Sequence, residues 1–421
     1  MRISIFGTGY VGSVTGICIA DLGHEIIFTD IDTAKLNLID HGQIPVFEPG
    51  LQQILTKNKK KISTNTNPIE AIINTDISFI CVGTPSREDG SLDTRSIESV
   101  SQTLGEGIGK KKNFHTIVVK STVIPGTIEE LILPIIMKES HKQVNNDFSV
   151  VSNPEFLREG NAVYDFFHPD RIIIGSNTPE SYRPLSELYS SFSCPKMVTT
   201  IKTAEMIKYV NNAFLATKIS FANEIGNICK EAGIDSYEVF KGVGMDSRIN
   251  PRFFRSGIGF GGSCFPKDVR ALIVYSKKVG IEPGILEAIL DTNQDQPSRL
   301  VSLLKRHMDL KGKTIGILGL AFKPETDDIR ESRAIPIIRQ LIADGANVLA
   351  FDPVAMKNFQ RIFPNIEYAT TSNRVLETDA VLIITEWSEF ENLDYTNKIV
   401  IDGRNIKKAR KNARIYEGVC W

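Results

Sequence analysis

The sequence predicts an α/β protein with two doubly wound, Rossmann-like domains, joined by a long central helix and a helical region. In the first third of the chain, short apolar runs alternate with helix-like segments, a pattern typical of a parallel sheet buried on both faces. The same succession returns in the last third, after a stretch with only helical periodicity. We therefore expect a first domain over residues 1–200, a central helical region over 201–298 and a second Rossmann-like domain over 299–421.

The first domain is expected to begin with a strand, a glycine-rich turn and a helix that ends near Leu22. Its predicted strands span residues 2–6, 25–30, 76–83 and 116–122, and the runs at 148–155 and 170–175 extend the sheet or cap it.

The middle of the chain is predicted to be helical. Residues 203–233 keep a helical period without a breaker until Gly226, which can lie inside the helix. Further helical segments are expected up to about Gly280 and again from Pro283 to about Met308.

The last third repeats the first. The segment 313–323 is predicted to be a strand followed by a glycine-rich turn. The runs at 346–353 and 378–387 mirror those at 24–32 and 75–85 in the same order. Three recurring strands in one order indicate a second doubly wound domain.

Composition limits the possible classes of protein. With 421 residues, 42% hydrophobic and 24% charged, the chain fits a globular protein of two or three domains. Lys and Arg (49) balance Asp and Glu (50), so no global field favours nucleic acid or a membrane surface. There is no apolar run of roughly 18 residues and no signal-peptide pattern, and the six cysteines are scattered without metal-ligand spacing. We expect a cytoplasmic protein with free thiols, no metal site and no membrane or nucleic-acid partner.

The turn after the first strand carries the pattern G-x-G-x-x-G. The predicted cofactor-binding residues of this turn are Gly7, Gly9, Tyr10, Val11 and Gly12. Its glycines permit the tight turn, the approach of a pyrophosphate and close packing of the helix on the sheet. Asp30 follows the second strand, 18 residues past Gly12, where a carboxylate would bind a ribose hydroxyl and repel a 2′-phosphate. This predicts NAD as the cofactor, and Lys35 lies close enough in sequence to reach the same ribose.

The second glycine-rich turn departs from this pattern. It keeps Gly316 and Gly319 but has Phe322 at the third glycine position. We expect this half to bind a different phosphate-bearing ligand, with Lys323 as a partner for the phosphate or as a solvated surface lysine.

The segment "GFGGSCFPKD" (259–268) surrounds Cys264 with glycines. A core cysteine has no need of glycines, whereas a loop whose backbone approaches a ligand does. The alternative is that Cys264 is a small buried hydrophobic residue. Asp268, four residues further on, is either a carboxylate of the same site or a helix cap.

Other polar residues could act with this thiol. Lys208 and Asn212 stand four apart on the long helix and so share a face, although Lys208 could instead pair with Glu205. Glu155 and Glu159 follow a strand, at the sheet edge where such folds bind ligands, although Glu159 could be a surface charge.

These residue types together suit a double oxidation. An aldehyde has no second hydride to give until a nucleophile adds to it, and a thiolate does so. The resulting adduct can lose a hydride to become a thioester, which water hydrolyses to an acid. The developing oxyanions need a cation and an amide donor, and hydrolysis needs an acid/base carboxylate.

The sequence resembles the UDP-glucose/GDP-mannose dehydrogenase family along essentially its whole length. The resemblance rests on "GTGYVG", "KSTVIPGT", "SNPEFLREG", "KYVNNAFLATKISFANE", "GFGGSCFPKD" and "FKPETDDIRESR" in the order and spacing of that family. It implies an NAD domain, a central helical region that forms the interface of a homodimer, and a C-terminal domain for a nucleotide sugar. The family oxidises the C6 alcohol of the sugar twice and consumes two NAD.

The resemblance also assigns roles to individual residues. It makes Cys264 the nucleophile, with Lys208 and Asn212 stabilising the oxyanion and Asp268 assisting the thiol and the water. The resemblance places the remaining catalytic residues at Glu155 and Thr122, cofactor contacts at Thr84, Thr122 and Glu159, and nucleotide-sugar contacts at Phe156, Leu157, Phe260, Gly261, Phe322, Lys323 and Arg404, along with Glu155, Lys208 and Asn212. Arg248 resembles the arginine that reaches into the site of the partner subunit.

Within the family, the motifs favour UDP-glucose as the substrate. "GGSC" and "PKDVRAL" are shared with GDP-mannose dehydrogenases, so GDP-mannose is the alternative, whereas Ser263 before the cysteine argues against an N-acetylated sugar. Two other classes remain to be separated by experiment: a single-step hydroxy-acid dehydrogenase, which needs no thiol, and a non-catalytic protein that binds NAD.

Overall fold

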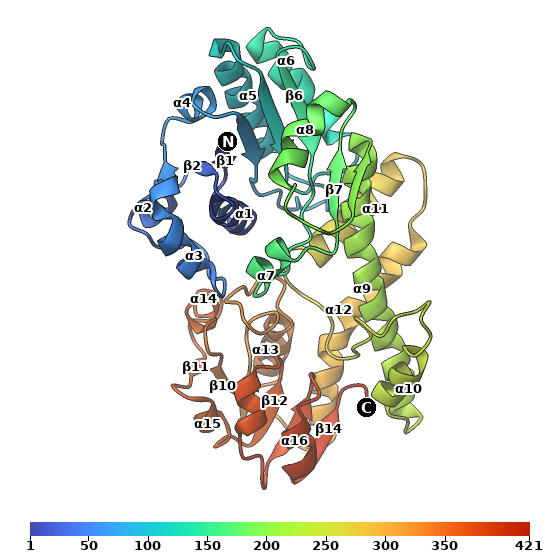
Figure 1. Cartoon of the computed structure of the whole chain (residues 1–421). Coiled ribbons are helices and arrows are strands. Elements are labelled where there is room, and N and C mark those ends of the chain that lie inside the picture. Colours follow the sequence, from blue (N-terminus) through green and yellow to red (C-terminus); the bar gives the residue numbers. More distant parts are fainter. The chain divides into compact units, whose positions relative to one another are not determined.

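The structure is a computed structural model that describes residues 1–421. The chain divides into two compact units, residues 1–210 and 211–421, each with one parallel or mostly parallel sheet and its helices (Figure 1). This confirms the predicted class of two Rossmann-like α/β domains. The division falls inside the long helix α9 (Ile201–Glu231), and the three-part division of the sequence stays a prediction.

The first unit contains an eight-stranded sheet in the order β3-β2-β1-β4-β5-β6-β7-β8. The strands are β1 (Arg2–Phe6), β2 (Glu25–Thr29), β3 (Ile62–Thr64), β4 (Ile77–Ile80), β5 (His115–Val119), β6 (Phe148–Ser152), β7 (Ile172–Gly175) and β8 (Lys196–Thr199). All neighbours pair in parallel except β6 and β7, which are antiparallel. The runs after position 148 therefore extend the sheet.

Helices connect these strands. They are α1 (Tyr10–Asp21), α2 (Thr33–Asp40), α3 (Leu51–Asn58), α4 (Pro68–Ile73), α5 (Arg95–Lys110), α6 (Leu133–Ser140), α7 (Ala162–Phe167) and α8 (Pro179–Leu188). In α4 and α8 a capping side chain, Asn67 or Thr178, precedes a proline in the first turn. Along β4, Ile77 and Phe79 join one apolar cluster and Ile80 another, because successive strand residues face opposite sides of the sheet.

Helix α9 spans 31 residues and confirms the long helix predicted over 203–233. Gly226 lies inside it. A Cβ at Gly226 would stand only 2.7 Å from the Cβ of Ser256 and 2.8 Å from that of Cys420, so close packing requires glycine there.

The second unit contains a six-stranded, all-parallel sheet in the order β11-β10-β9-β12-β13-β14. This is the same order as β3-β2-β1-β4-β5-β6 in the first sheet. Its strands are β9 (Thr314–Leu318), β10 (Asn347–Phe351), β11 (Glu367–Tyr368), β12 (Ala380–Ile383), β13 (Ile399–Asp402) and β14 (Ile415–Gly418). The predicted repeat of strands is therefore confirmed.

The helices that begin within the second unit are α10 (Ser236–Val243), α11 (Phe265–Lys278), α12 (Gly284–Lys305), α13 (Ala334–Ala343), α14 (Met356–Phe359), α15 (Ser372–Val375) and α16 (Lys407–Asn412). A loop over residues 244–264 interrupts the helical segments expected up to Gly280, and only its glycine-rich part before Cys264 was predicted to be a loop. Asn250 and Phe253 there have positive φ angles, and several glycines and Pro251 oppose a helix. None of the helices is both long and apolar enough to cross a membrane.

Candidate active site

The turn between β1 and α1 has the backbone that a dinucleotide site needs. Gly7 has a φ of 99°, in the left-handed region that favours glycine. A Cβ at Gly12 would lie 1.9 Å from the carbonyl oxygen of Gly7, so no side chain fits there. A Cβ at Gly9, the N-cap of α1, would meet no atom within 4 Å, so there is open space at the start of the helix. These features fit a pyrophosphate at the helix N-terminus.

Asp30 follows β2 directly, as predicted. Its Oδ2 accepts hydrogen bonds from the Thr8 amide (2.5 Å) and hydroxyl (2.7 Å), and its Oδ1 accepts one from the Asp32 amide (2.9 Å). Burial alone would raise the pKa of Asp30, but these hydrogen bonds, with a smaller contribution from Lys35, lower it. The ionised carboxylate is thus held beside the glycine turn, where it fits a ribose hydroxyl. Lys35 itself lies on α2 and pairs with Asp32 at 3.7 Å.

Tyr10 and Val11 occupy the first turn of α1. Val11 packs against the apolar cluster beneath the helix. Burial raises the pKa of the Tyr10 hydroxyl far above its ordinary value, and the hydroxyl donates to the carboxylate of Glu48. That carboxylate also accepts hydrogen bonds from the Gly160 amide (2.7 Å) and the Ala162 amide (2.6 Å). Glu48 therefore joins the loop that follows Glu155 to helix α1, a role that the sequence did not predict.

Two predicted threonines meet at the carboxyl ends of β4 and β5. The hydroxyl of Thr84 donates to the carbonyl oxygen of Thr122 at 2.8 Å. Ser121 fixes the same crossing, since its hydroxyl donates to the Val82 carbonyl at 2.7 Å. The side chain of Thr122 is partly exposed at this edge, which suits a residue that positions water.

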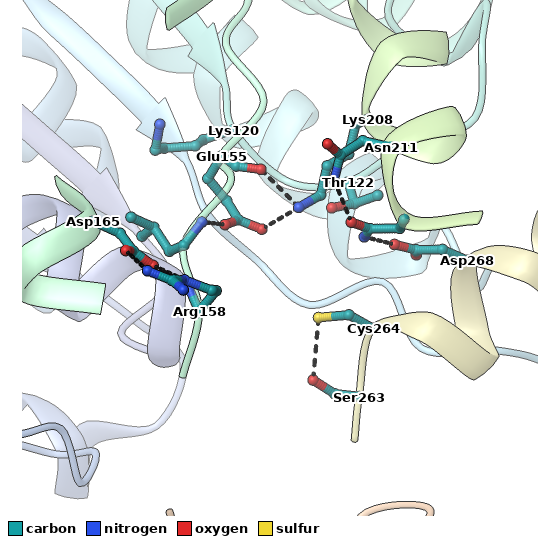
Figure 2. A network of polar contacts seen from close by, with 12 residues as sticks. Lys120, Thr122, Glu155, Arg158, Asp165, Lys208, Asn211, Ser263, Cys264 and Asp268 are labelled. Carbon is teal, nitrogen blue, oxygen red and sulfur yellow. Dashed lines mark hydrogen bonds and ion pairs between the residues drawn. The ribbon is translucent and has the colours of Figure 1, made fainter. Parts of the chain in front are cut away.

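Glu155 and Lys208 form a buried ion pair (Figure 2). The Lys208 Nζ donates to Glu155 Oε1 at 2.8 Å and to the Glu155 carbonyl oxygen at 2.7 Å. Burial would raise the pKa of Glu155, but Lys208 and the Leu157 amide outweigh burial and lower it. The alternative pairing of Lys208 with Glu205 is wrong, because the Glu205 carboxylate accepts the amides of Gly126 (2.6 Å) and Ile128 (3.0 Å).

The rest of the loop after β6 stays close to this pair. Leu157 supplies the amide that donates to Glu155 Oε2 at 2.6 Å. The ring of Phe156 lies under the guanidinium of Arg171, 3.9 Å from its centre, and under the Lys208 ammonium at 5.4 Å. Glu159 is partly buried and acts electrostatically on Tyr10. Its predicted contact with the cofactor stays a prediction.

In the second unit, Cys264 is the N-cap of α11 and is the one cysteine of the chain whose side chain is exposed. Its Sγ lies 3.5 Å from the Ser263 hydroxyl. Asp268 is buried in the first turn of the same helix, where its Oδ2 accepts from Asn212 Nδ2 at 2.6 Å and its Oδ1 from Lys267 Nζ at 2.6 Å. The cap and buried-hydrophobe alternatives for Asp268 and Cys264 are therefore wrong.

The glycines before Cys264 have protein neighbours. A Cβ at Gly261 would lie 2.3 Å from the carbonyl oxygen of Glu331, and one at Gly262 2.7 Å from the ring of Phe322. Gly262 also has a φ of 84°, and its amide donates to the Arg330 carbonyl at 2.8 Å. Two of the glycines thus seat the cysteine loop on the loop of residues 322–331, rather than merely making room for a ligand.

Three buried amides also hold the cysteine loop, and none was predicted. Asn223 on α9 accepts from the Gly257 amide at 2.7 Å, and Gln296 on α12 donates to the Gly257 carbonyl at 2.6 Å. Asn293 binds both backbone groups of Phe260, at 2.7 and 3.0 Å. In the sequence all three look like surface amides on a helix. The only signal is that Asn293 and Gln296 stand among the apolar positions of α12.

The predicted sugar-nucleotide contacts in this unit are of two kinds. The ring of Phe260 is buried in a small apolar cluster, and Asn293 binds its backbone N–H and carbonyl, so its contact with a sugar nucleotide stays a prediction. Phe322 and Lys323 are partly exposed in the loop after β9. Asp352, the counterpart of Asp30, is fully buried and accepts the amides of Leu320 (2.7 Å) and Ala321 (3.0 Å). Asp352 thus holds its glycine-rich turn as Asp30 does, but it is fully buried, and the phosphate-bearing ligand expected at this turn stays a prediction.

The two remaining arginines lie on loops. Arg404 follows β13, and its Nε donates to the Ile384 carbonyl at 2.7 Å. Buried Asp402 fixes this loop by accepting the amides of Arg404 (2.7 Å) and Ile406 (2.6 Å), and burial raises the pKa of Asp402 to about 6. Arg248 is exposed and pairs with Asp246 at 2.6 Å, so its predicted reach into a partner subunit stays a prediction.

A dinucleotide turn with an acidic residue after the second strand, together with the second parallel sheet, defines the class: an NAD-dependent oxidoreductase with two Rossmann-like domains. Comparison with known proteins agrees with this class. Three family models match, described as the NAD binding, central and UDP binding domains of the UDP-glucose/GDP-mannose dehydrogenase family, over residues 1–193, 202–295 and 316–409. The chain belongs to the UDP-glucose/GDP-mannose dehydrogenase family.

Individual relatives cover nearly the whole chain. A UDP-glucose 6-dehydrogenase of Haloferax volcanii is 44% identical over 98% of both chains. A GDP-mannose 6-dehydrogenase of Pseudomonas aeruginosa is 40% identical over 88% of this chain and 82% of its own. The structure of a UDP-glucose dehydrogenase from Pyrobaculum islandicum superposes with a TM-score of 0.96 at 43% identity, covering 100% of this chain and 98% of the other.

Proposed function

We propose that the protein oxidises the C6 alcohol of UDP-glucose twice, to UDP-glucuronate, through a covalent adduct on Cys264. The observation that carries this proposal is the exposed thiol at the start of α11, one turn before the buried Asp268–Asn212 pair. A helix N-terminus favours a thiolate. An enzyme that removes only one hydride has no use for such a thiol.

NAD would bind at the glycine turn and Asp30, and when bound it accepts a hydride at each oxidation. Thr84, Thr122 and Glu159 lie after β4, β5 and β6, the edge at which such folds bind their ligands. These residues orient the cofactor. Asp30, ionised beside the turn, would disfavour the 2′-phosphate of NADP.

The thiol and the amide–cation pair act on the aldehyde. The Cys264 thiolate adds to the aldehyde carbon and forms a hemithioacetal, whose oxygen carries the negative charge. Lys208 and Asn212 are four residues apart on α9, which places them on one face of that helix, so an ammonium and an amide can serve the same oxyanion. Loss of the second hydride converts the adduct into a thioester.

Water then releases the acid. Glu155 takes a proton from the water that Thr122 positions. Asp268, which took the proton of the Cys264 thiol before its attack on the aldehyde, returns that proton to the departing sulfur. In total, one alcohol and one water yield one carboxylate, two hydrides and three protons. The Glu155–Lys208 ion pair suits both stages, since Lys208 is charged for the oxyanion and Glu155 ionised for the water.

The relatives support UDP-glucose as the substrate. The Haloferax relative named for UDP-glucose is 44% identical to this chain, whereas the Pseudomonas relative named for GDP-mannose is 40% identical. We infer that the sugar nucleotide contacts Phe156, Leu157, Phe260, Gly261, Phe322, Lys323 and Arg404. GDP-mannose is the second candidate, because that relative is still 40% identical.

We also infer a homodimer through α9. Val210, Phe214, Phe221 and Ile228 are each half exposed or more, and their spacing of four and seven residues sets them along one face of the helix. A second copy of the chain would cover this stripe. Sedimentation of the wild type and of Phe214→Glu tests it: a dimer that becomes a monomer supports the inference, and a monomeric wild type contradicts it.

The stoichiometry of NADH tests the function. We expect two NADH per UDP-glucose consumed by the wild type, and no acid released by Cys264→Ser. Cys194→Ser, at a partly exposed cysteine outside the site, is the control and should match the wild type. One NADH per sugar and unchanged turnover in Cys264→Ser would point to a single-step dehydrogenase. Activity with GDP-mannose alone would overturn the substrate.

A further inference from the structure

A second buried lysine lies beside the Glu155–Lys208 pair. Lys120 follows β5 directly and is 6% exposed. Its Nζ donates to Asn153 Oδ1 at 3.0 Å and to the Asn153 carbonyl at 3.4 Å. No carboxylate lies within ion-pair distance of it. A buried ammonium without an ion-pair partner is costly, and its retention calls for an explanation.

The position of Lys120 is fixed from several elements. The Asn153 side chain that receives it also accepts from the Tyr189 hydroxyl at 2.8 Å and donates to the Ile173 carbonyl at 2.8 Å. The Asn153 amide donates to the Val119 carbonyl at 2.9 Å. Residues of β5, β7 and the end of α8 thus fix Asn153, which binds the Lys120 ammonium. Asn153 stands two residues before Glu155 in the loop after β6.

The titratable and charged groups around Lys120 come from four elements. They are Cys81 after β4, Glu155 after β6, Tyr189 after α8 and Lys208 on α9. Burial raises the pKa of both Cys81 and Tyr189, so both stay neutral at ordinary pH. Burial lowers the pKa of Lys120 to about 8, which leaves it mostly charged at neutral pH. Among these four groups, Glu155 is therefore the one anion.

We propose that Lys120 is a positioning residue that keeps Glu155 ionised while Lys208 serves the substrate oxyanion. The inference rests on the proposed function. When Lys208 turns its hydrogen bonds to the oxyanion, Glu155 loses its ion-pair partner in a buried place and would take up a proton. Lys120 is held by Asn153 and not by Glu155, so it stays behind as a fixed positive charge. A protonated Glu155 could not accept the proton of the hydrolytic water.

The test compares pH profiles of turnover with UDP-glucose and NAD. Lys120→Met removes the charge, Lys120→Gln removes it but keeps a donor for Asn153, and Lys120→Arg keeps it. Lys111→Met is the matched control: Lys111 is also buried, but it donates to the backbone carbonyls of Ile72 and Thr75 and faces His115. Each variant is also assayed for NADH per sugar and for thermal unfolding.

The acidic limb of the profile is the readout. Activity falls as pH drops through the pKa of Glu155 in the complex, and loss of Lys120 raises that pKa. In Lys120→Met and Lys120→Gln we expect the limb to move to higher pH by about one unit, with Lys120→Arg and Lys111→Met unshifted.

Coincident limbs in the wild type and in either neutral variant would overturn the inference while leaving the double oxidation standing. A lowered unfolding temperature with an unshifted limb would likewise overturn it and make Lys120 structural. A wild type that forms no NADH from any nucleotide sugar would overturn the proposed function itself, and the role of Lys120 with it.

Discussion

At the residue scale, Lys208 is buried in an ion pair and is also the proposed donor to the substrate oxyanion. Its side chain is 5% exposed, and its ammonium donates to both the carboxylate and the carbonyl oxygen of Glu155. Removing one partner of a buried pair leaves an uncompensated charge, whereas an exposed pair contributes little.

Replacing Lys208 should therefore lower both the stability of the fold and the turnover of the enzyme. For Lys208→Ala we expect the free energy of unfolding to fall by about 3 kcal/mol or more, and turnover by at least about 100-fold. Lys202→Ala, on the same helix, breaks only exposed contacts with Glu129 and Glu130 and should stay within about 0.5 kcal/mol. Denaturant unfolding and NADH formation measure the two effects. Equal losses in both variants would contradict the buried-pair account.

Asp30 gives a second prediction at this scale. Asp30→Asn keeps one acceptor for Thr8 but removes the negative charge. We expect the KM for NAD to rise and the preference for NAD over NADP, measured as the ratio of kcat/KM values, to fall by about 10-fold or more. The control is Asp32→Asn, at the exposed N-cap of α2. An unchanged ratio in Asp30→Asn would remove Asp30 from the ribose site.

Among the elements, the cysteine loop depends most on contacts that are distant in sequence. Its glycines lie against the loop after β9, and amides on α9 and α12 bind its backbone. The placement of Cys264 therefore depends on the second Rossmann-like sheet as well as on α11.

Filling this contact should displace the thiol. For Gly262→Ala we expect turnover to fall by at least about 10-fold, because the new Cβ meets the Phe322 ring at a positive φ. Gly242→Ala on α10 is the control: its Cβ meets nothing within 4 Å, and alanine favours a helix. The rate at which iodoacetamide labels Cys264 reports the displacement directly. Wild-type turnover and labelling in Gly262→Ala would contradict the packing argument.

At the scale of the whole molecule, a buried polar network links stability to pH. It lies at the amino ends of the central strands β4 and β5, away from the carboxyl ends that carry the candidate site. His115 is fully buried between Lys111 (3.0 Å) and the Ser78 hydroxyl (2.8 Å). Burial, with the repulsion of Lys111, lowers the pKa of His115 to about 3. The unfolded chain binds this proton near pH 6.5 and the folded chain does not.

Because the pKa of His115 is lower in the folded chain, the contribution of His115 to the free energy of unfolding is fully present above about pH 6.5. It is lost as pH falls toward 3, at about 1.4 kcal/mol per pH unit at most. Unfolding in urea at several pH values measures the slope, and in His115→Gln this part of the slope should disappear. His41→Gln, at an exposed histidine, should keep it. A slope that is identical in the wild type and His115→Gln would contradict the buried neutral histidine.

The strands could be predicted from the sequence because parallel strands buried on both faces are short apolar runs, and their repetition revealed the second sheet. Lys208 with Asn212, and Cys264 with Asp268, could be singled out because the members of each pair stand only four residues apart. The partner of Lys208 could not, since Glu205 stands three residues away but Glu155, 53 residues away, binds it. Asn223, Asn293 and Gln296 were equally hidden, because only tertiary packing turns a helix amide into a loop anchor.

The central claim is that the sugar is held as a thioester on Cys264, and intact-mass spectrometry tests it most directly. In Glu155→Gln, hydrolysis should stall after two NADH per active site have formed. We predict that this variant, mixed with UDP-glucose and NAD, gains the mass of one UDP-glucuronyl group, located on the peptide that contains Cys264. The double variant with Cys264→Ser should gain none. A stalled enzyme without the added mass, or the same mass in the double variant, would contradict the account.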